Sequence, residues 1–254
     1  MTWTFRTGAA CAAMTVLALA GCGGSDDDTL TVSAAASLKK ALTQYGGDFQ
    51  DAKARFSFAG SDELAAQIRK GAKPDVFASA NTKLPDELYK EGLVERPVTF
   101  AGNRLVLAVP ASSDAKIASL DDIRKPGTSL AIGSESVPVG SYTRTVLAKL
   151  PEPESSAIMK NVRSEEPDVA GIVGKLTQGA VDAGFVYISD VRATDGKLKA
   201  IELPDSLQPT VAYGVAVVKD AKHADAAKKF VDGLLDGDGK QALDDAGFEP
   251  PPAQ

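Results

Sequence analysis

The chain has little of the residues that metal and thiol chemistry require. Its 254 residues include two cysteines and one histidine, which are too few for a zinc site built from cysteine and histidine ligands. A catalytic triad would have to use His223, which follows a lysine at the start of a charged helical pattern. We expect His223 on a solvated face. The composition therefore argues against a metalloenzyme or a thiol enzyme.

Basic runs and aromatic side chains are also scarce. Lys and Arg number 28 against 34 Asp and Glu, for a formal charge of −6, and no clustered basic segment is present to hold nucleic-acid phosphates. The single tryptophan, Trp3, lies in a segment that we expect to be removed. Adjacent carboxylates on a helix point apart, so we interpret the acidic pairs as solvated charge rather than acid–base pairs. These pairs are Asp121-Asp122, Glu165-Glu166 and Asp244-Asp245. We predict that the protein is not an enzyme.

No apolar run is long enough to cross a membrane as a helix. The stretch from Gly8 to Ala20 follows Arg6 and is shorter than the roughly 20 residues that a bilayer requires. It ends at Gly21-Cys22, which resembles the lipobox of bacterial lipoproteins. The resemblance implies a signal peptide at 1–21, acylation of Cys22, and a flexible tether at 22–28 that holds an extracytoplasmic domain at the cell membrane. An ordinary secretory signal with an accidental cysteine is the alternative.

Short β-rich runs alternate with helical patterns from Thr29 onward. This alternation predicts an α/β fold with mainly parallel strands. The predicted strands are 30–32, 55–58, 74–78, 105–109, 129–132, 185–187 and 211–218. The predicted helices are 38–49, 64–70, 141–150, 169–178, 224–235 and 239–246. Ligands of such folds bind beyond the carboxyl ends of strands, where helix N-termini present free N–H groups.

Serines occupy two of the predicted strand-to-helix turns. Ser37 follows the first strand and Ser61 follows the second. Each serine can cap its helix with its side-chain oxygen, or it can direct its hydroxyl and amide at an anion, assisted by the helix dipole. The segments 136–142 and 165–169 and the residue Tyr187 are further candidates of the same kind. The residues alone leave both interpretations open.

In their order along the chain, these turns resemble those of the molybdate-binding proteins of bacterial ABC importers. The similarity rests on Ala34-Ala35-Ala36-Ser37-Leu38, Phe58-Ala59-Gly60-Ser61, Gly102-Asn103-Arg104-Leu105-Val106, Val137-Pro138-Val139-Gly140-Ser141-Tyr142 and Val186-Tyr187-Ile188-Ser189-Asp190. It implies a two-lobed periplasmic-binding-protein fold of type II, in which each lobe is a mainly parallel sheet flanked by helices. Two crossover strands, near 105–109 and 211–218, would join the lobes. Lobe I would contain 29–105 and 211–254, and lobe II would contain 106–210.

The resemblance also implies a ligand and its contacts. An oxyanion would be held by the hydroxyls and amides of Ser37 and Ser61, the backbone amides of Val139 and Val169, and the phenol of Tyr187. No cation ligand and no cofactor would take part. The ligand would be molybdate, with tungstate, delivered by a monomer to an ABC permease and its ATPase. A receptor for sulfate or phosphate is the alternative, and an enzyme on the same scaffold is a more distant one.

A pocket made only of donors favours an oxyanion that carries no proton. Molybdate, tungstate and sulfate are fully deprotonated at pH 7, whereas phosphate keeps a proton and requires an acceptor. Asp62, directly after Ser61, could reverse this preference if its carboxylate entered the cleft. The sequence does not decide where Asp62 points. It also leaves the cavity size open, and Val139 stands where the family often has a smaller alanine.

Overall fold

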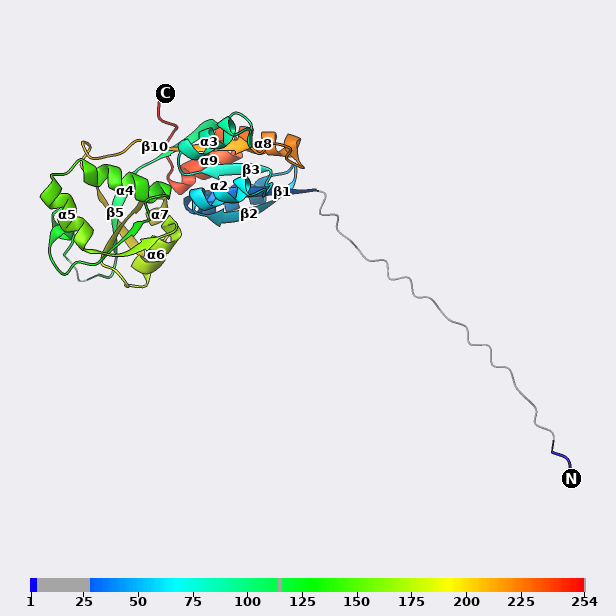
Figure 1. The fold of residues 1–254 in the computed structure, drawn as a ribbon, viewed down its shortest axis with the longest axis horizontal. Coiled ribbons are helices and arrows are strands. Elements are labelled where there is room, and N and C mark those ends of the chain that lie inside the picture. The colour runs from blue at the N-terminus through cyan, green and yellow to red at the C-terminus, as the bar shows by residue number, and fades with distance from the viewer. Residues whose placement is uncertain (4–27, 114–115, 254) are drawn as a thin grey trace.

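The computed structural model describes residues 1–3, 28–113 and 116–253. The predicted signal peptide, the acylation site Cys22 and all of the predicted tether except Asp28 thus fall largely or wholly outside the described residues. Two α/β lobes lie side by side, and the chain passes between them twice (Figure 1). Within the described ranges, no helix combines the length and the apolar character that a membrane span needs.

Each lobe is built on one five-stranded sheet. The first sheet contains β1 (Thr29–Ala35), β2 (Lys53–Ala59), β3 (Val76–Ser79), β4 (Val98–Asn103) and β10 (Val211–Val217). The second contains β5 (Leu105–Pro110), β6 (Leu130–Gly133), β7 (Val162–Glu166), β8 (Ala183–Tyr187) and β9 (Leu198–Glu202). The strand orders are β2-β1-β3-β10-β4 and β7-β6-β8-β5-β9.

One strand of each sheet opposes the others. β10 pairs antiparallel with β3 and β4, and β5 pairs antiparallel with β8 and β9, while the remaining neighbours are parallel. The opposing strands are the two that the sequence predicted as crossovers. The two-lobed, mainly parallel fold is therefore confirmed, and the two sheets follow the same plan.

Two connections join the lobes. The first passes from β4 to β5 through Arg104, and the second runs from β9 to β10 through 203–210. The predicted lobe boundary after Leu105 stays a prediction, although Leu105 itself pairs with Tyr187 in the second sheet. The C-terminal segment lies against the first connection, because Gly102 N donates to Glu249 O at 2.7 Å and Glu249 N donates to Gly102 O at 3.0 Å.

Helices cover both sheets (Figure 1). Those of the first lobe are the short 3-10 helix η2 (Ala36–Leu38), α1 (Lys39–Asp48), α2 (Ser61–Arg69), α3 (Lys83–Lys90), α8 (Ala224–Leu235) and α9 (Asp238–Ala246). Those of the second lobe are α4 (Pro138–Ala148), α5 (Glu152–Lys160), α6 (Val169–Thr177) and α7 (Ile188–Arg192), with the 3-10 turn η3 (Asp122–Arg124). α9 packs against α1 and α8, so the chain's last helices complete the first lobe.

The sequence did not predict α3, α5, β4, β7 or β9. α3 and α5 contain Pro85 and Pro153 near their starts, where proline is tolerated because the first-turn N–H groups have no helical partner. β7 is an edge strand of polar residues, with every second side chain exposed. Its sequence therefore lacks the apolar run that marks the buried strands.

Both lobes contain the same carboxylate clamp at matching positions, with Asp75 buried and Asp182 partly buried. Asp75 Oδ2 accepts from Thr31 N and Thr31 Oγ1 at 2.7 Å each, and Asp182 Oδ2 accepts from Ser129 N and Ser129 Oγ at 2.7 Å each. Asp75 directly precedes β3 and accepts from Thr31 of β1, and Asp182 directly precedes β8 and accepts from Ser129, the residue before β6. In each lobe the two strands concerned pair in parallel. The clamps tie these strand pairs together at their starts.

His223 belongs to the clamp of the first lobe, so the expected solvated position is wrong. Its backbone N donates to Asp75 Oδ1 at 2.9 Å, and its Nδ1 lies 3.3 Å from Asp75 Oδ2. Its side chain is 15% exposed. Because an ionised carboxylate only accepts hydrogen bonds, Nδ1 carries the proton in this contact. The sequence pattern showed a charged helix start and could not show a partner 148 residues away.

Burial by itself would raise the pKa of Asp75, but the hydrogen bonds from Thr31 and His223 outweigh it and hold the pKa below its usual value. The folded-state pKa is therefore lower than the unfolded-state pKa. The carboxylate contributes stability at neutral pH, and this contribution is lost as the pH falls through the acid range.

We predict that Asp75→Asn lowers the free energy of unfolding by about 1–3 kcal/mol at pH 7, because buried donors lose their acceptor. The loss should shrink at acid pH, where the wild-type carboxyl is itself protonated. Urea unfolding at several pH values measures both effects, with exposed Asp48→Asn as the matched control. Equal stability of Asp75→Asn and wild type at pH 7 would contradict the role given to the clamp.

Candidate functional site

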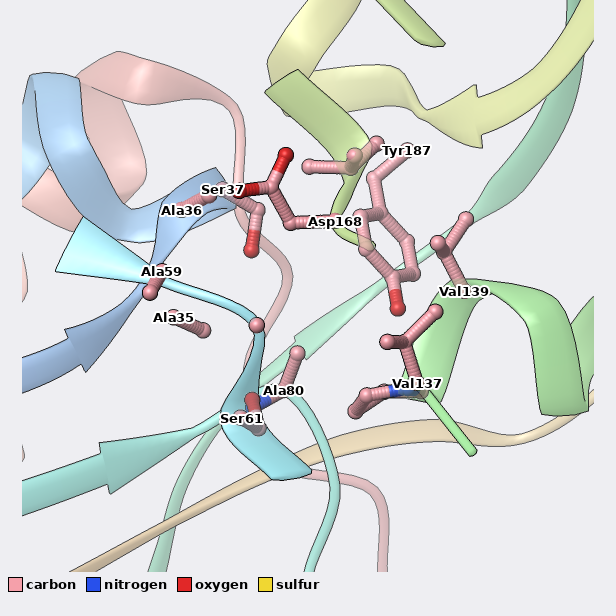
Figure 2. Close-up of a pocket in the computed structure, with 13 residues that line it drawn as sticks. Ala35, Ala36, Ser37, Ala59, Ser61, Ala80, Val137, Val139, Asp168 and Tyr187 are labelled. Atoms are coloured by element: carbon pink, nitrogen blue, oxygen red, sulfur yellow. The ribbon is translucent and has the colours of Figure 1, made fainter. Parts of the chain in front are cut away.

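A cavity lies between the lobes, at the carboxyl ends of strands from both sheets. The space that protein atoms leave free there, including its opening to solvent, measures about 230 Å³. Its walls combine small apolar side chains with a few polar groups (Figure 2). The lining residues are Ala35, Ala36, Ser37, Ala59, Gly60, Ser61, Ala80, Val137, Pro138, Val139, Asp168, Val169 and Tyr187.

All five site residues named from the sequence line this one cavity: Ser37, Ser61, Val139, Val169 and Tyr187. The strand plan explains why they meet. Ser37 follows β1 and Ser61 follows β2 in the first sheet. Val139 and Val169 follow the equivalent strands β6 and β7 of the second sheet, and Tyr187 ends β8. The two lobes therefore present equivalent strand ends to each other, as open α/β sheets do at their ligand sites.

Neither serine caps a helix. The N-cap of α2 is Gly60, and the N-cap of α1 is Leu38, in both cases without a side-chain capping bond. Ser61 Oγ instead accepts from Ala80 N at 3.1 Å, and Ser37 Oγ lies 2.9 Å from the phenol oxygen of Tyr213. The capping interpretation left open by the sequence is thus excluded, and the hydroxyls lie at the cavity.

Helix N-termini supply the cavity's other donors. Val139 is in the first turn of α4, and Val169 is the first residue of α6. First-turn amides have no carbonyl partner within their own helix, and they lie at the positive end of the helix dipole. None of the lysines and arginines that the structure describes lines the cavity. The site can therefore attract negative charge through neutral groups alone.

Tyr187 places a buried donor beside the cavity. Its side chain is 1% exposed, and its hydroxyl has no hydrogen-bond partner among the described residues. Its ring makes edge contacts with Tyr142 and Tyr213, with centroids 6.4 and 5.8 Å away. Figure 2 shows the phenol oxygen directed into the cavity. An unsatisfied buried polar group costs about 1–3 kcal/mol, and this hydroxyl is available to donate to a ligand in the cavity.

Burial raises the pKa of Tyr187 well above 10, and the neighbouring Tyr213, Tyr142 and Asp190 add to this effect. The phenol therefore keeps its proton at neutral pH and remains a donor.

The carboxylate that lines the cavity is Asp168, and Asp62 does not line it. Asp62 Oδ1 is buried near Gly60 and has no hydrogen-bond partner among the described residues. Asp168 is the N-cap of α6, and its Oδ1 accepts from Gly171 N at 2.9 Å. Asp168 is not among the contacts predicted from the sequence, although an aspartate directly before an apolar helix is a signal for an N-cap.

A second carboxyl, Asp190, lies behind Tyr187. Its side chain is buried, and its Oδ2 accepts from Tyr187 N at 3.0 Å. Burial raises the pKa of Asp190 to about 7; the hydrogen bond from Tyr187 opposes this shift and the charge of Asp168 adds to it. Among the described residues, no group of His, Cys, Asp and Glu is arranged to hold a metal ion.

Known proteins resemble the chain over nearly its whole length. A family model described as bacterial extracellular solute-binding protein matches residues 30–249. The molybdate-binding protein of Mycobacterium tuberculosis (strain ATCC 25618 / H37Rv) is 34% identical, across 99% of this chain and 100% of the relative. A putative ABC transporter substrate-binding lipoprotein of Bacillus subtilis (strain 168) is 30% identical, across 91% of this chain and 93% of the relative.

A solved structure shares the fold. The periplasmic molybdate-binding protein of Azotobacter vinelandii aligns with a TM-score of 0.77 at 22% sequence identity, covering 88% of this chain and 100% of that chain. At this level of identity the match supports the arrangement of lobes and sheets described above.

The raised pKa of Asp190 predicts that stability falls as the pH rises. Between the unfolded value of 3.8 and about 7, the folded protein holds a proton that the unfolded chain releases, so its free energy of unfolding decreases with pH. Asp190→Asn keeps an acceptor for Tyr187 N and removes the titration. We expect its stability to depend less on pH between about 4 and 7, by up to about 1.4 kcal/mol per pH unit.

Denaturant unfolding of wild type and Asp190→Asn across this range measures the difference. Exposed Asp205→Asn serves as the control, because its removal should leave the wild-type slope unchanged. Parallel profiles for wild type and Asp190→Asn would show that the buried carboxyl titrates normally.

Proposed function

The chain belongs to the bacterial extracellular solute-binding protein family, and we propose that it captures molybdate, and tungstate with it, for delivery to an ABC importer. The observation that carries this proposal is the buried, unpartnered hydroxyl of Tyr187 in a cavity whose other polar contacts are mostly neutral donors. The names of the relatives, which include a molybdate-binding protein and an ABC transporter substrate-binding lipoprotein, support it.

The donors suit a tetrahedral dianion without any cationic residue. We assign the contacts to the hydroxyls and amides of Ser37 and Ser61, the amides of Val139 and Val169, and the Tyr187 phenol. A hydrogen bond to a charged group is worth about 1.5–3 kcal/mol, so several together offset an association cost of about 4–15 kcal/mol. The set is large enough for micromolar or tighter binding.

The candidate anions differ in whether they carry a proton at neutral pH. Molybdate, tungstate and sulfate have no proton to donate at neutral pH, and a donor-rich cavity satisfies them. The position of Asp168 in the cavity lining favours a second candidate ligand, hydrogen phosphate. A carboxylate there can accept a hydrogen bond from the phosphate proton. One oxygen of Asp168 is already engaged by Gly171 N, which reduces its capacity to accept another.

The cellular context follows from the N-terminus and the relatives. We propose that the chain is cleaved before Cys22, acylated there, and held outside the cytoplasm as a monomer that meets its permease at the membrane. The small residues before Cys22 and the lipoprotein named among the relatives support this arrangement. Two acyl chains anchor a protein stably, whereas one binds only marginally.

Calorimetric titration with four anions tests the ligand. We expect molybdate and tungstate to bind at micromolar or lower concentration, sulfate to bind more weakly, and phosphate to give no measurable heat. Tight binding of phosphate together with absent molybdate binding would contradict the proposal and would favour the role of Asp168 as an acceptor.

The Tyr187→Phe variant tests whether molybdate binds in this cavity. Removing the hydroxyl should weaken molybdate binding by about 1–3 kcal/mol, which is roughly 5-fold to 150-fold. Tyr89→Phe is the matched control, because Tyr89 is 46% exposed and is not among the residues that line the cavity. Equal affinities of Tyr187→Phe and wild type would move the binding site elsewhere.

The two lobes touch at Gly60. A Cβ atom on Gly60 would lie 2.5 Å from the carbonyl oxygen of Pro167 in the other lobe. The backbone fixes the position of a Cβ atom, and the Pro167 oxygen is itself a backbone atom, so rotation of a side chain cannot relieve the clash. A side chain at position 60 would force the lobes apart, and a ligand that bridges them requires this close approach.

We expect Gly60→Ala to weaken molybdate binding by about tenfold or more, equivalent to 1.4 kcal/mol. Gly47→Ala is the control, because nothing lies within 4 Å of the added atom there. Titration gives the affinity, and small-angle scattering of the molybdate-saturated proteins gives the radius of gyration, which should be larger for Gly60→Ala. Unchanged values of both would show that the lobes close without the Gly60–Pro167 approach.

A further inference from the structure

A series of buried hydrogen bonds connects Ser37, at the cavity, to Tyr213, Asn103 and Ser189 outside it. We propose that Tyr213 and Asn103 are positioning residues, which orient the Ser37 hydroxyl so that it donates its proton into the cavity. This inference rests on the proposed function, because it concerns one contact of the proposed oxyanion. Neither residue lines the cavity itself.

The contacts run from the first lobe to the second. Ser37 Oγ lies 2.9 Å from the hydroxyl of Tyr213, and both side chains are buried. Asn103 Nδ2 lies 3.5 Å from the same hydroxyl and 2.8 Å from Ser189 Oγ. Tyr213 is on β10, Asn103 ends β4, and Ser189 is in α7 of the second lobe.

The backbone decides which way the Asn103 amide faces. Arg104 N donates to Asn103 Oδ1 at 2.9 Å, so Oδ1 is the end of the amide that accepts. The other end, Nδ2, has only protons to offer, and it faces Tyr213 and Ser189. Tyr213 therefore meets a donor on the Asn103 side.

The proton of Tyr213 must then go to Ser37. Ser37 Oγ is the acceptor beside the Tyr213 hydroxyl in the hydrogen bonds of the described residues. Burial raises the pKa of Tyr213 well above 10, so the phenol has a proton to donate at neutral pH. Once Ser37 Oγ accepts it, the serine's own proton is left for the cavity. The reverse direction would turn a serine lone pair toward a bound anion.

A double-mutant cycle tests this assignment. Molybdate affinity is measured by calorimetry for Ser37→Ala, Tyr213→Phe and the double variant. We expect Tyr213→Phe alone to weaken binding about tenfold, and to cause less than about a twofold further loss when Ser37 is already alanine. Non-additivity of this kind separates positioning of Ser37 from a general loss of packing.

Two further variants make the result decisive. Tyr45→Phe is the matched control, because Tyr45 is also a buried tyrosine of the first lobe whose hydroxyl donates to Phe230 O at 3.2 Å, away from the cavity. Its affinity for molybdate should equal that of wild type. A second cycle combines Asn103→Ala with Ser37→Ala, and we expect the same non-additivity in molybdate affinity. This second cycle tests the inference even if Tyr213→Phe folds poorly.

The outcomes separate this inference from the proposed function. Tyr213→Phe or Asn103→Ala could each weaken molybdate binding by the same factor whether residue 37 is serine or alanine. That result would overturn the positioning role while leaving molybdate capture intact. Unchanged affinity of both single variants would overturn it as well. Failure of the wild-type protein to bind molybdate would overturn the proposed function and this inference together.

Discussion

The site depends on buried donors that the fold itself leaves without acceptors. The Tyr187 hydroxyl is enclosed among aromatic rings and has no partner in the described residues, and the first-turn amides of α2, α4 and α6 have none within their helices. Leaving such groups unsatisfied opposes folding. These donors converge from two lobes on one space, whose lining among the described residues includes no lysine or arginine. The lining is therefore suited to negative charge through neutral groups alone.

The matching plans of the two lobes explain this convergence. Each sheet contains a strand pair with an aspartate clamp at its start, and cavity residues lie at or after the other ends of the same strands. One opposing strand in each sheet belongs to a crossing between lobes. The two lobes therefore present turns at equivalent strand ends, although the residues in those turns differ. The first lobe presents serines, and the second presents helix amides and a tyrosine.

Local patterns in the sequence predicted the turns well and the tertiary contacts poorly. Ser37, Ser61 and Tyr187 stand next to recognisable strand ends, so the sequence pointed to the cavity residues that follow from strand order. β7 was missed because an edge strand needs no apolar run, and His223 was misplaced because its partner Asp75 is distant in the chain. The contact between Ser37 and Tyr213 joins residues 176 apart, and no spacing rule in one sequence predicts such a pair.

The direction of β1 has a consequence for how the molecule can be attached to a surface. β1 ends at Ala35 in the cavity wall and begins at Thr29, roughly 20 Å away along an extended strand. The C-terminal segment, in contrast, pairs with Gly102 beside the first connection. A sensor chip or a bilayer linked through the N-terminal side would hold the receptor by the end of one lobe and leave its mouth accessible. Linkage through the last residues would instead attach the molecule beside one of the two connections between the lobes.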